Sequence, residues 1–297
     1  MQKIVIITGQ TASGKSKLGV QLAKEFNGEI ISADSVQIYK QLNIGSAKDP
    51  IEERLGVEHH LIDIKEPTDN YNVGEFITDC KNAIENIISK GKTPFIVGGS
   101  AMYIKALMEG FSLGGANANI EFRKHYENMA KENGNVAVWN ELNALNPTKA
   151  QDVHPNNLKR VIRYLEIEKF GNNTPNTESI LKDYNVCAVG IVADRETIYN
   201  KINKRTDIML NMGLEEEVAN LYKQGITRDM QSVTSICYRE WFDYFEGKID
   251  KNRVIELIKQ HCRNYAKRQL TFLKTMKNIE ILTYEQADKK IRSFLND

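Results

Sequence analysis

Short apolar runs alternate with longer amphipathic segments along the first hundred residues. The runs at 4–7, 29–32 and 93–97 are rich in β-branched residues, which is typical of buried parallel strands, and the run at 61–64 predicts another strand. Apolar residues recur at helical spacing in 17–26, 74–90 and 101–108. Strands that alternate with helices in this order predict an α/β fold with a parallel, doubly wound sheet.

The middle of the chain carries helical patterns only. Two stretches rich in small and polar residues, 112–119 and 171–177, flank it and are typical of hinges. We therefore expect an inserted all-helical subdomain at 116–184, and a core formed by 1–115 and 185–297. A strand is predicted at 186–191, followed by a helix over 195–212 that Asp194 caps, a helix over 214–224, and basic C-terminal helices.

Composition limits the class of protein. The chain has 297 residues, of which 41% are hydrophobic and 27% charged, as in ordinary globular proteins. No apolar run approaches the roughly 18 residues of a membrane span, and the first strand follows the initial Met almost at once, so we expect neither membrane contact nor a leader. The cysteines lack the spacing of metal or redox motifs, which favours reduced thiols in the cytoplasm: Cys80, Cys187, Cys237 and Cys262.

Charge is unevenly distributed along the chain. The formal net charge is +1, yet residues 251–277 contain eight Lys or Arg and a single acid, Glu256. A second basic face, with Lys159, Arg160 and Arg163, lies on a predicted helix of the inserted segment. Both features suit a polyanion such as RNA, and a simply solvated basic face is the alternative for each.

A glycine-rich loop directly follows the first predicted strand and leads into the first predicted helix. This context is typical of a phosphate-binding loop, in which backbone N–H groups and the helix N-terminus face the phosphates. The Lys supplies a charge for the terminal phosphate, and the final Ser is placed to ligate Mg²⁺. The motif does not distinguish a nucleotide from another diphosphate, and a simple Gly-rich turn is the structural alternative. The predicted diphosphate-binding residues are Gly9, Gln10, Thr11, Ala12, Ser13, Gly14, Lys15 and Ser16.

Asp34 follows the second predicted strand, at the strand end where α/β sheets place their chemistry. It is a candidate catalytic carboxylate, and a helix cap is the alternative role. The polar stretch 36–48 is interpreted as a binding loop rather than core. His59 and His60 point to opposite faces of an extended chain, so we do not expect them to share a metal.

Several segments together resemble the tRNA dimethylallyltransferases, also called tRNA isopentenyltransferases, of the bacterial type. The similarity covers nearly the whole chain. The phosphate loop is shared with many enzymes, and the combination of the other segments is specific. Besides the loop, the similar segments are 32–40, 44–48, 97–100, 154–157, 160–163, 205–209, 213–216 and 265–269.

The resemblance implies a P-loop core with an inserted helical domain. It also implies transfer of the dimethylallyl group from dimethylallyl diphosphate to N6 of the adenosine immediately 3′ of the tRNA anticodon, with release of diphosphate. On this basis Ser16, through Mg²⁺, and Arg205 stabilise the leaving diphosphate, and Asp34 accepts the proton of the adenine amine. The expected partners are the anticodon stem-loop of tRNA and the diphosphate donor, with a monomeric enzyme. The expected tRNA-binding residues are Asp34, Ser35, Val36, Gln37, Ser100, Arg123, Lys159, Arg160, Arg163, Tyr238, Arg239, Lys267 and Arg268.

The chain departs from the family pattern at four positions. Gln10 and Asp49 stand where proline is usual, Cys237 where glycine is usual, and Thr234 where Gln or Arg is common.

Two other functions are considered. An ATP-dependent small-molecule kinase would use the same loop, but we find neither a later strand that ends in an obvious Mg²⁺-binding aspartate nor an arginine-rich lid. An RNA-binding switch would leave Asp34 without a role.

Overall fold

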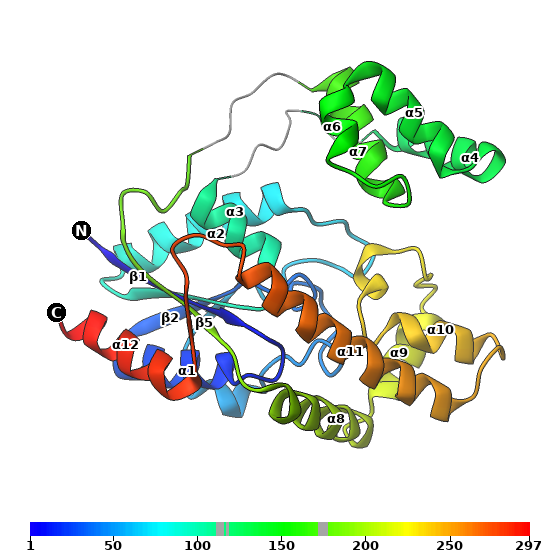
Figure 1. Ribbon diagram of the computed structural model, residues 1–297. Helices are drawn as coiled ribbons and strands as arrows, with labels where there is room; N and C mark the ends of the chain where they lie inside the picture. The colour runs from blue at the N-terminus through cyan, green and yellow to red at the C-terminus, as the bar shows by residue number, and fades with distance from the viewer. Residues whose placement is uncertain (111–115, 117–118, 172–177) are drawn as a thin grey trace. The chain divides into compact units, whose positions relative to one another are not determined.

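A computed structural model of the chain describes residues 1–110, 116, 119–171 and 178–297, and it divides into two compact units (Figure 1). The main unit comprises Met1–Glu109 and Ser179–Asp297, and the helical unit comprises Gly110–Glu178. The expected subdomain boundaries, 116 and 184, each lie six residues further along the chain than the ends of the helical unit, Gly110 and Glu178. Leu181 belongs to the core of the main unit, because its side chain is buried there. The expected hinges at 112–119 and 171–177 fall largely outside the described residues.

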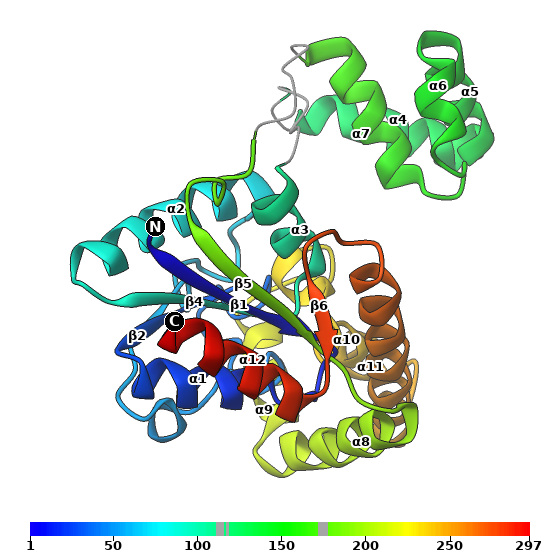
Figure 2. The same cartoon turned by 60° about the vertical axis from the view of Figure 1, so that its left-hand side comes forward.

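A six-stranded sheet with every strand parallel forms the centre of the main unit. This arrangement confirms the predicted α/β parallel-sheet fold. Val5, Ile6 and Ile7 of β1 pair with β4 on one side and β5 on the other, so the loop that follows β1 emerges from the middle of the sheet (Figure 2). In spatial order the strands are β3 (His59–His60), β2 (Gly28–Ser32), β4 (Thr93–Val97), β1 (Lys3–Gly9), β5 (Asn185–Ile191) and β6 (Glu280–Leu282).

Two sheet edges differ from the sequence prediction. The strand expected at 61–64 is wrong, since the strand is His59–His60 and the chain then turns through Leu61 and Asp63, whose φ angles are +61° and +56°. Left-handed backbone of this kind ends a strand. The edge strand β6 is too short to give a recognisable alternation of polar and apolar residues.

Helices cover both faces of the sheet. Contacts place α1 and α12 on one face, and α2, α3 and α11 on the other (Figures 1 and 2). The helix expected at 195–212 is confirmed, with the Asp194 carboxylate capping the Thr197 N–H at 2.8 Å. The helices of the main unit are α1 (Lys15–Glu25), α2 (Val73–Ser89), α3 (Ala101–Glu109), α8 (Arg195–Asn211), α9 (Leu214–Lys223), α10 (Arg239–Phe245), α11 (Lys251–Leu273) and α12 (Tyr284–Asn296), with 3₁₀ turns at Ile51–Arg54 and Gln231–Thr234.

Alternate residues of β1 enter different hydrophobic cores. Ile4 and Ile6 belong to the larger core, under α2, α3 and α11, whereas Val5 and Ile7 belong to the core beneath α1 and α12. Both faces of β1 are therefore buried, as expected for a central parallel strand. The larger core also contains Ile38, Tyr39 and Leu42, so the segment 36–48 is not only a binding loop as predicted.

The helical unit has a core of its own. Its helices are α4 (Ile120–Asn133), α5 (Asn135–Leu145), α6 (Pro147–Gln151) and α7 (Leu158–Phe170), and their apolar faces meet around Val138, Leu142 and Leu165. No helix in the described parts of the chain is long and apolar enough to cross a membrane.

Candidate functional site

The glycine-rich loop joins β1 to α1 at the carboxyl edge of the sheet. Gly9 has a φ of +138°, and a Cβ built on it would lie 2.2 Å from the Ile191 carbonyl oxygen, so only glycine fits where the loop leaves the strand. The N–H groups that open α1, at Lys15 and Ser16, have no acceptor within their own helix. Ser13 Oγ is buried and has no hydrogen-bond partner in the described structure. The loop therefore presents several donors to an anion.

Lys15 is a half-buried cation beside this loop. Its ammonium donates a hydrogen bond of 2.7 Å to the Gln10 carbonyl oxygen. Burial, and then repulsion by Arg205, lower the pKa of Lys15 to about 8, and attraction by the Asp34 carboxylate partly opposes them. Arg205, on α8, also donates a hydrogen bond of 3.4 Å to Thr11 Oγ1. Two predicted site residues from separate parts of the chain, Arg205 and Asp34, thus both act electrostatically on Lys15.

Asp34 lies just beyond the end of β2 and is half-buried. Its Oδ1 accepts hydrogen bonds from the Val36 N–H at 2.9 Å and the Gln37 N–H at 3.4 Å. These bonds cap a turn, whereas the alternative considered from the sequence was a helix cap. The turn fixes one carboxylate oxygen and thereby orients the other.

Ser100 holds the Asp34 turn from the neighbouring strand end. Its Oγ accepts a hydrogen bond of 2.9 Å from the Ser35 N–H and donates one of 3.2 Å to Ser35 Oγ. A Cβ added to Gly98 would lie 2.1 Å from the Ala33 carbonyl oxygen, so glycine is required for the two strand ends to approach. The predicted site residues of the 32–36 and 97–100 segments are therefore brought together.

Gln37 was predicted to bind tRNA, but its amide group is already engaged inside the protein. Its Oε1 accepts from Ser32 Oγ at 3.0 Å, and its Nε2 donates to the carbonyl oxygens of Ser46 and Ala47 at 3.3 and 3.1 Å. Val36, beside it, is half-buried against the larger core. In this arrangement Gln37 supports the 43–47 loop.

Tyr238 requires a correction. It was expected to contact tRNA, but its side chain is fully buried, because the phenol lies beneath the 43–47 loop. Its hydroxyl donates to Glu217 Oε1 at 2.8 Å and accepts from the Ser46 N–H at 3.1 Å. The Glu217 carboxylate in turn accepts from the N–H groups of Asn43, Ile44 and Gly45 at 3.0, 2.8 and 3.1 Å. Tyr238 and Glu217 therefore hold this loop rather than face solvent.

Asp49, which the sequence analysis did not predict as a site residue, lies near Ser16. The Ser16 side chain is among the groups that act on the Asp49 carboxylate, whose pKa is raised by burial and then by repulsion from Glu53, against the attraction of Arg54 and Arg205. A hydroxyl and a carboxylate are the oxygen donors that Mg²⁺ prefers. The residues present therefore fit the predicted Mg²⁺, with Asp49 as an additional candidate ligand.

Gln269 and Tyr265 of α11 also reach the loop, and neither was predicted as a site residue. Gln269 Oε1 accepts from the Thr11 N–H at 2.7 Å, and its Nε2 donates to the Gly99 carbonyl oxygen at 2.9 Å. The Tyr265 hydroxyl donates to the same carbonyl oxygen at 3.2 Å. Both residues lie in the 265–269 segment that carried the family resemblance, which was the only signal able to identify them.

A basic groove runs along the exposed side of α11. It has a volume of about 660 Å³ and includes the predicted tRNA-binding residues Arg239, Lys267 and Arg268. The guanidinium of Arg268 lies 5.9 Å from the ring centre of Tyr265, and Arg239 is paired with Glu240 at 2.9 Å. The remaining lining residues are His261, Asn264, Thr271, Phe272 and Thr275.

The helical unit holds the other predicted tRNA-binding residues. Arg123 and Arg163 both pair with the buried carboxylate of Glu166, at 2.7 and 2.5 Å. Burial alone would raise the pKa of Glu166, but the hydrogen bonds, led by that of Arg123, hold it below its usual value. Lys159 and Arg160 are exposed on α7, and Arg160 donates to the Tyr164 hydroxyl at 2.8 Å.

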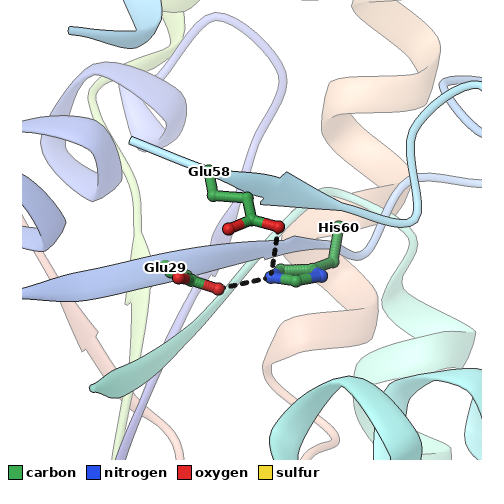
Figure 3. A group of neighbouring side chains, drawn as sticks. All are labelled: Glu29, Glu58 and His60. Carbon is green, nitrogen blue, oxygen red and sulfur yellow. Dashed lines mark hydrogen bonds and ion pairs between the residues drawn. The ribbon is translucent and has the colours of Figure 1, made fainter. Parts of the chain in front are cut away.

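A second cluster, of Glu29, Glu58 and His60, lies at the opposite end of β2 (Figure 3). One ligand atom from each residue falls within 4.8 Å of the others. However, Lys92 and Lys90 also pair with the fully buried Glu29 carboxylate, at 2.6 and 3.1 Å. A carboxylate already neutralised by two ammonium groups is a poor metal ligand, so we interpret the cluster as structural.

The parallel sheet, with polar loops gathered at the carboxyl ends of β1, β2 and β4, defines an α/β protein of the class that binds ligands at this edge. The profile described as IPP transferase matches residues 37–276. The chain therefore belongs to the IPP transferase family, which confirms the resemblance found from the sequence.

Curated relatives and solved structures support the same conclusion. A tRNA dimethylallyltransferase of Halalkalibacterium halodurans is 40% identical over 99% of this chain and 96% of its own length. One of Geobacillus kaustophilus is 42% identical over 92% and 88%. A full-length tRNA isopentenylpyrophosphate transferase from Bacillus halodurans superposes with a TM-score of 0.74 at 38% identity, over 100% of this chain and 96% of that one. A eukaryotic dimethylallyltransferase acting on tRNA gives a TM-score of 0.78 at 27% identity, over 99% and 77%.

Proposed function

We propose that this chain is a tRNA dimethylallyltransferase that transfers the dimethylallyl group from dimethylallyl diphosphate to N6 of the adenosine 3′ of the anticodon, with release of diphosphate. The transfer of this group to tRNA follows from family membership and from the names of near full-length relatives. One observation in the site supports the chemistry: the Asp34 carboxylate, after β2, acts electrostatically on Lys15 of the phosphate loop, after β1, and raises its pKa, so the two groups lie near each other at the carboxyl edge of the sheet. A diphosphate and a proton-donating amine therefore have adjacent places to bind.

The phosphate loop is proposed to bind the donor diphosphate. Negative charge grows on the diphosphate as the allylic C–O bond breaks, so donors aimed at it stabilise the transition state more than the ground state. Lys15 and Arg205 supply positive charge, and the N–H groups at the start of α1 supply hydrogen bonds. Ser13 Oγ, buried without a partner in the described structure, would gain one from a diphosphate oxygen.

Asp34 is proposed to accept the proton of the adenine amine. Its Oδ1 is held by the turn, so Oδ2 is the oxygen assigned to the amine. The exocyclic amine is a poor nucleophile until a base removes its proton as the new C–N bond forms. The adenine must leave the base stack to reach this carboxylate, and the Ser35 and Ser100 hydroxyls, which lie beside it, are assigned to the edge of the flipped base.

Mg²⁺ is proposed to be held by the Ser16 hydroxyl and the Asp49 carboxylate, together with oxygens of the donor. When bound, it supplies Lewis-acid stabilisation of the departing diphosphate. The Ser16 side chain acts on the pKa of Asp49, so these two oxygen donors are near each other before the diphosphate donor arrives.

Two basic surfaces are proposed to bind the tRNA anticodon stem-loop. The groove along α11 offers Lys267 and Arg268, and α7 of the helical unit offers Lys159 and Arg160. Half-buried aromatic rings, Tyr265 beside the groove and Tyr164 on α7, lie next to these cations, and this combination suits phosphates together with unstacked bases. We further propose a monomeric enzyme in a reducing cytoplasm, in keeping with four free cysteines.

The test is to incubate the protein with unmodified tRNA, Mg²⁺ and either dimethylallyl diphosphate or ATP, and to analyse the tRNA nucleosides by mass spectrometry. We expect dimethylallyl adenosine only with the isoprenoid donor, at a single position next to the anticodon. Consumption of ATP without any prenylated nucleoside would instead indicate a kinase.

The role of Asp34 is tested with Asp34→Asn, and Asp183→Asn, an exposed acid elsewhere in the main unit, serves as the matched control. We expect turnover to fall by roughly 10²- to 10⁴-fold in the first variant, because general-base catalysis contributes that much. The affinity for tRNA should change little, and the control should retain normal turnover. Normal turnover in Asp34→Asn would remove this carboxylate from the mechanism.

A further inference from the structure

Two cysteines far apart in the sequence meet where α10 and α11 pack together. Cys237 lies just before α10 and is buried, and Cys262, in the middle of α11, is half-buried. Cys237 belongs to the larger core of the main unit and Cys262 packs against that core. Each thiol is the leading influence on the pKa of the other, so the two side chains lie close together. The other two cysteines, Cys80 and Cys187, are buried and lie in other elements, α2 and β5.

Hydrogen bonds independent of the thiols hold the two segments together at the same place. The Glu240 carboxylate accepts from the Cys237 N–H at 3.0 Å through one oxygen. Its other oxygen lies 2.7 Å from Nδ1 of His261, the residue next to Cys262 in the sequence. One carboxylate therefore joins the backbone of the first cysteine to the neighbour of the second.

The backbone at Cys237 is also unusual. Its φ is +79°, in the left-handed region where a side chain is strained and glycine is favoured. A cysteine at such a position costs stability, and neither the proposed active site nor the basic groove uses its thiol. This combination points to a role for the thiol itself.

We propose that Cys237 and Cys262 are a redox modification site: hydrogen peroxide or a small-molecule disulfide converts the two thiols into an intramolecular disulfide that links the start of α10 to α11 and slows the enzyme.

The surroundings assign different roles to the two thiols. The interaction with the Cys237 side chain, assisted by the positive charges of Arg205 and Arg239, lowers the pKa of Cys262, while burial and Glu240 oppose this shift. The same interaction and burial raise the pKa of Cys237. Cys262 is also the more accessible of the two. It is therefore the attacking thiolate, and Cys237 is the thiol that resolves the intermediate.

The reaction with peroxide balances in two steps. The Cys262 thiolate attacks one peroxide oxygen, so that an S–O bond forms, the O–O bond breaks, and the second oxygen leaves as water after it takes a proton. Cys237 sulfur then attacks the resulting sulfenic acid, so that the S–S bond forms and a second water leaves with the Cys237 proton. The two thiols lose two electrons, and both peroxide oxygens end as water. A small disulfide reacts by exchange and releases two small thiols instead.

The crosslink would act on two segments that hold the loops of the proposed active site in place. Cys237 immediately precedes Tyr238, whose hydroxyl holds Glu217 and the Ser46 N–H. Cys262 lies two turns before Gln269, which holds the phosphate loop at Thr11. A disulfide fixes the two Cα atoms at about 4.4–6.8 Å. It therefore restricts the movement of Tyr238 relative to α11. This effect on rate depends on the proposed function, whereas the formation of the crosslink does not.

The first experiment uses the reduced full-length protein. It is treated with hydrogen peroxide or oxidised glutathione, denatured, and alkylated with N-ethylmaleimide before intact-mass and peptide analysis. We expect the number of alkylated thiols to fall from four to two, with a peptide pair that joins Cys237 to Cys262. Met212, whose side chain is highly exposed, reports the oxidant dose within the same sample. Full oxidation of Met212 with all four thiols still alkylated overturns the proposal.

Variants separate the proposal from general oxidation. Cys237→Gly should abolish the crosslink and leave a trappable sulfenic acid on Cys262, and it should fold, because glycine suits the backbone there. Cys80→Ser and Cys187→Ser, the matched controls, should still form the crosslink. A disulfide that involves Cys80 or Cys187 would contradict the assignment. The peptide analysis of the wild-type protein reveals such a disulfide even if a control variant fails to fold.

The second experiment measures turnover before oxidation, after oxidation and after reduction with dithiothreitol. We expect oxidation to lower prenyl transfer by at least several-fold, dithiothreitol to restore it, and Cys237→Gly to resist the loss. A quantitative crosslink with unchanged turnover refutes the regulatory role. If the reduced protein itself fails to prenylate tRNA, the proposed function fails, while the crosslink result still decides whether the modification site exists.

Discussion

Lys15 should determine how binding of the diphosphate donor depends on pH. Its pKa is lowered from 10.5 to about 8, chiefly by burial and then by Arg205. This shift corresponds to a cost of roughly 3 kcal/mol for charging the lysine in the free site, at about 1.4 kcal/mol per pKa unit. The negatively charged diphosphate donor binds more tightly when Lys15 is protonated. Below pH 8 Lys15 is already protonated and affinity should be flat, whereas above pH 8 affinity should fall by up to tenfold per pH unit.

The total loss is limited by the value of one charged contact. A hydrogen bond to a charged group contributes about 1.5–3 kcal/mol, so donor affinity should fall by roughly 10- to 150-fold before it levels off. The assay is calorimetric binding of dimethylallyl diphosphate without tRNA, at fixed Mg²⁺, between pH 6.5 and about 10. The organic diphosphate is fully ionised above neutral pH, so the protein sets the change.

Three variants test the cause of the inflection. Arg205→Gln removes a repelling charge, so the inflection should move to higher pH although affinity falls overall. Asp34→Asn removes an attracting charge, so the inflection should move to lower pH. Lys15→Gln should abolish the inflection, and the exposed neighbour Lys17→Gln should keep it. An inflection that survives in Lys15→Gln, or that stays at one pH in the Arg205 and Asp34 variants, refutes the reasoning.

Three further predictions follow from contacts away from the phosphate loop. Tyr238→Phe removes the donor to Glu217 and the acceptor of the Ser46 N–H. It should destabilise the main unit by about 1–3 kcal/mol in urea unfolding and raise the KM for tRNA; an unchanged KM would separate the 43–47 loop from tRNA binding. Lys267→Ala with Arg268→Ala should weaken tRNA binding and reduce its salt dependence by about two charges, as measured by fluorescence titration; an unchanged slope would place the contact elsewhere. Glu166→Gln should increase hydrogen exchange in α4 and α7 by removing part of the charge that holds Arg123; equal exchange in wild type and variant would argue against this.

Local structure was predictable where the signal was continuous in the sequence. Ile4–Ile7, the glycine loop and the helix after it form one uninterrupted segment, so the predicted strand, loop and helix are confirmed. Asp194 was likewise predictable as a cap, because its partner Thr197 is three residues away. Such features depend on near neighbours and therefore survive folding unchanged.

Contacts between distant segments could not be predicted. The bonds of Gln269 to Thr11 and Gly99 arise only because α11 packs beside the sheet edge. Residues 61–64 are apolar enough for a strand, but the positive φ angles at Leu61 and Asp63 show that tertiary contacts decided their backbone. The burial of Tyr238 had no signal in the sequence either, since an isolated tyrosine beside an arginine suits a surface equally well.

The Glu29 cluster has a practical consequence for chemical footprinting. Lys90 and Lys92 are only about one third exposed, at 35% and 34%, yet their ammonium groups balance a carboxylate that has no exposure at all. Acylating reagents aimed at surface amines would remove that balance and leave an uncompensated anion in the interior. Loss of activity after lysine labelling would then report damage to the sheet, so protection of Lys267 by RNA must be measured at reagent doses that spare Lys90 and Lys92.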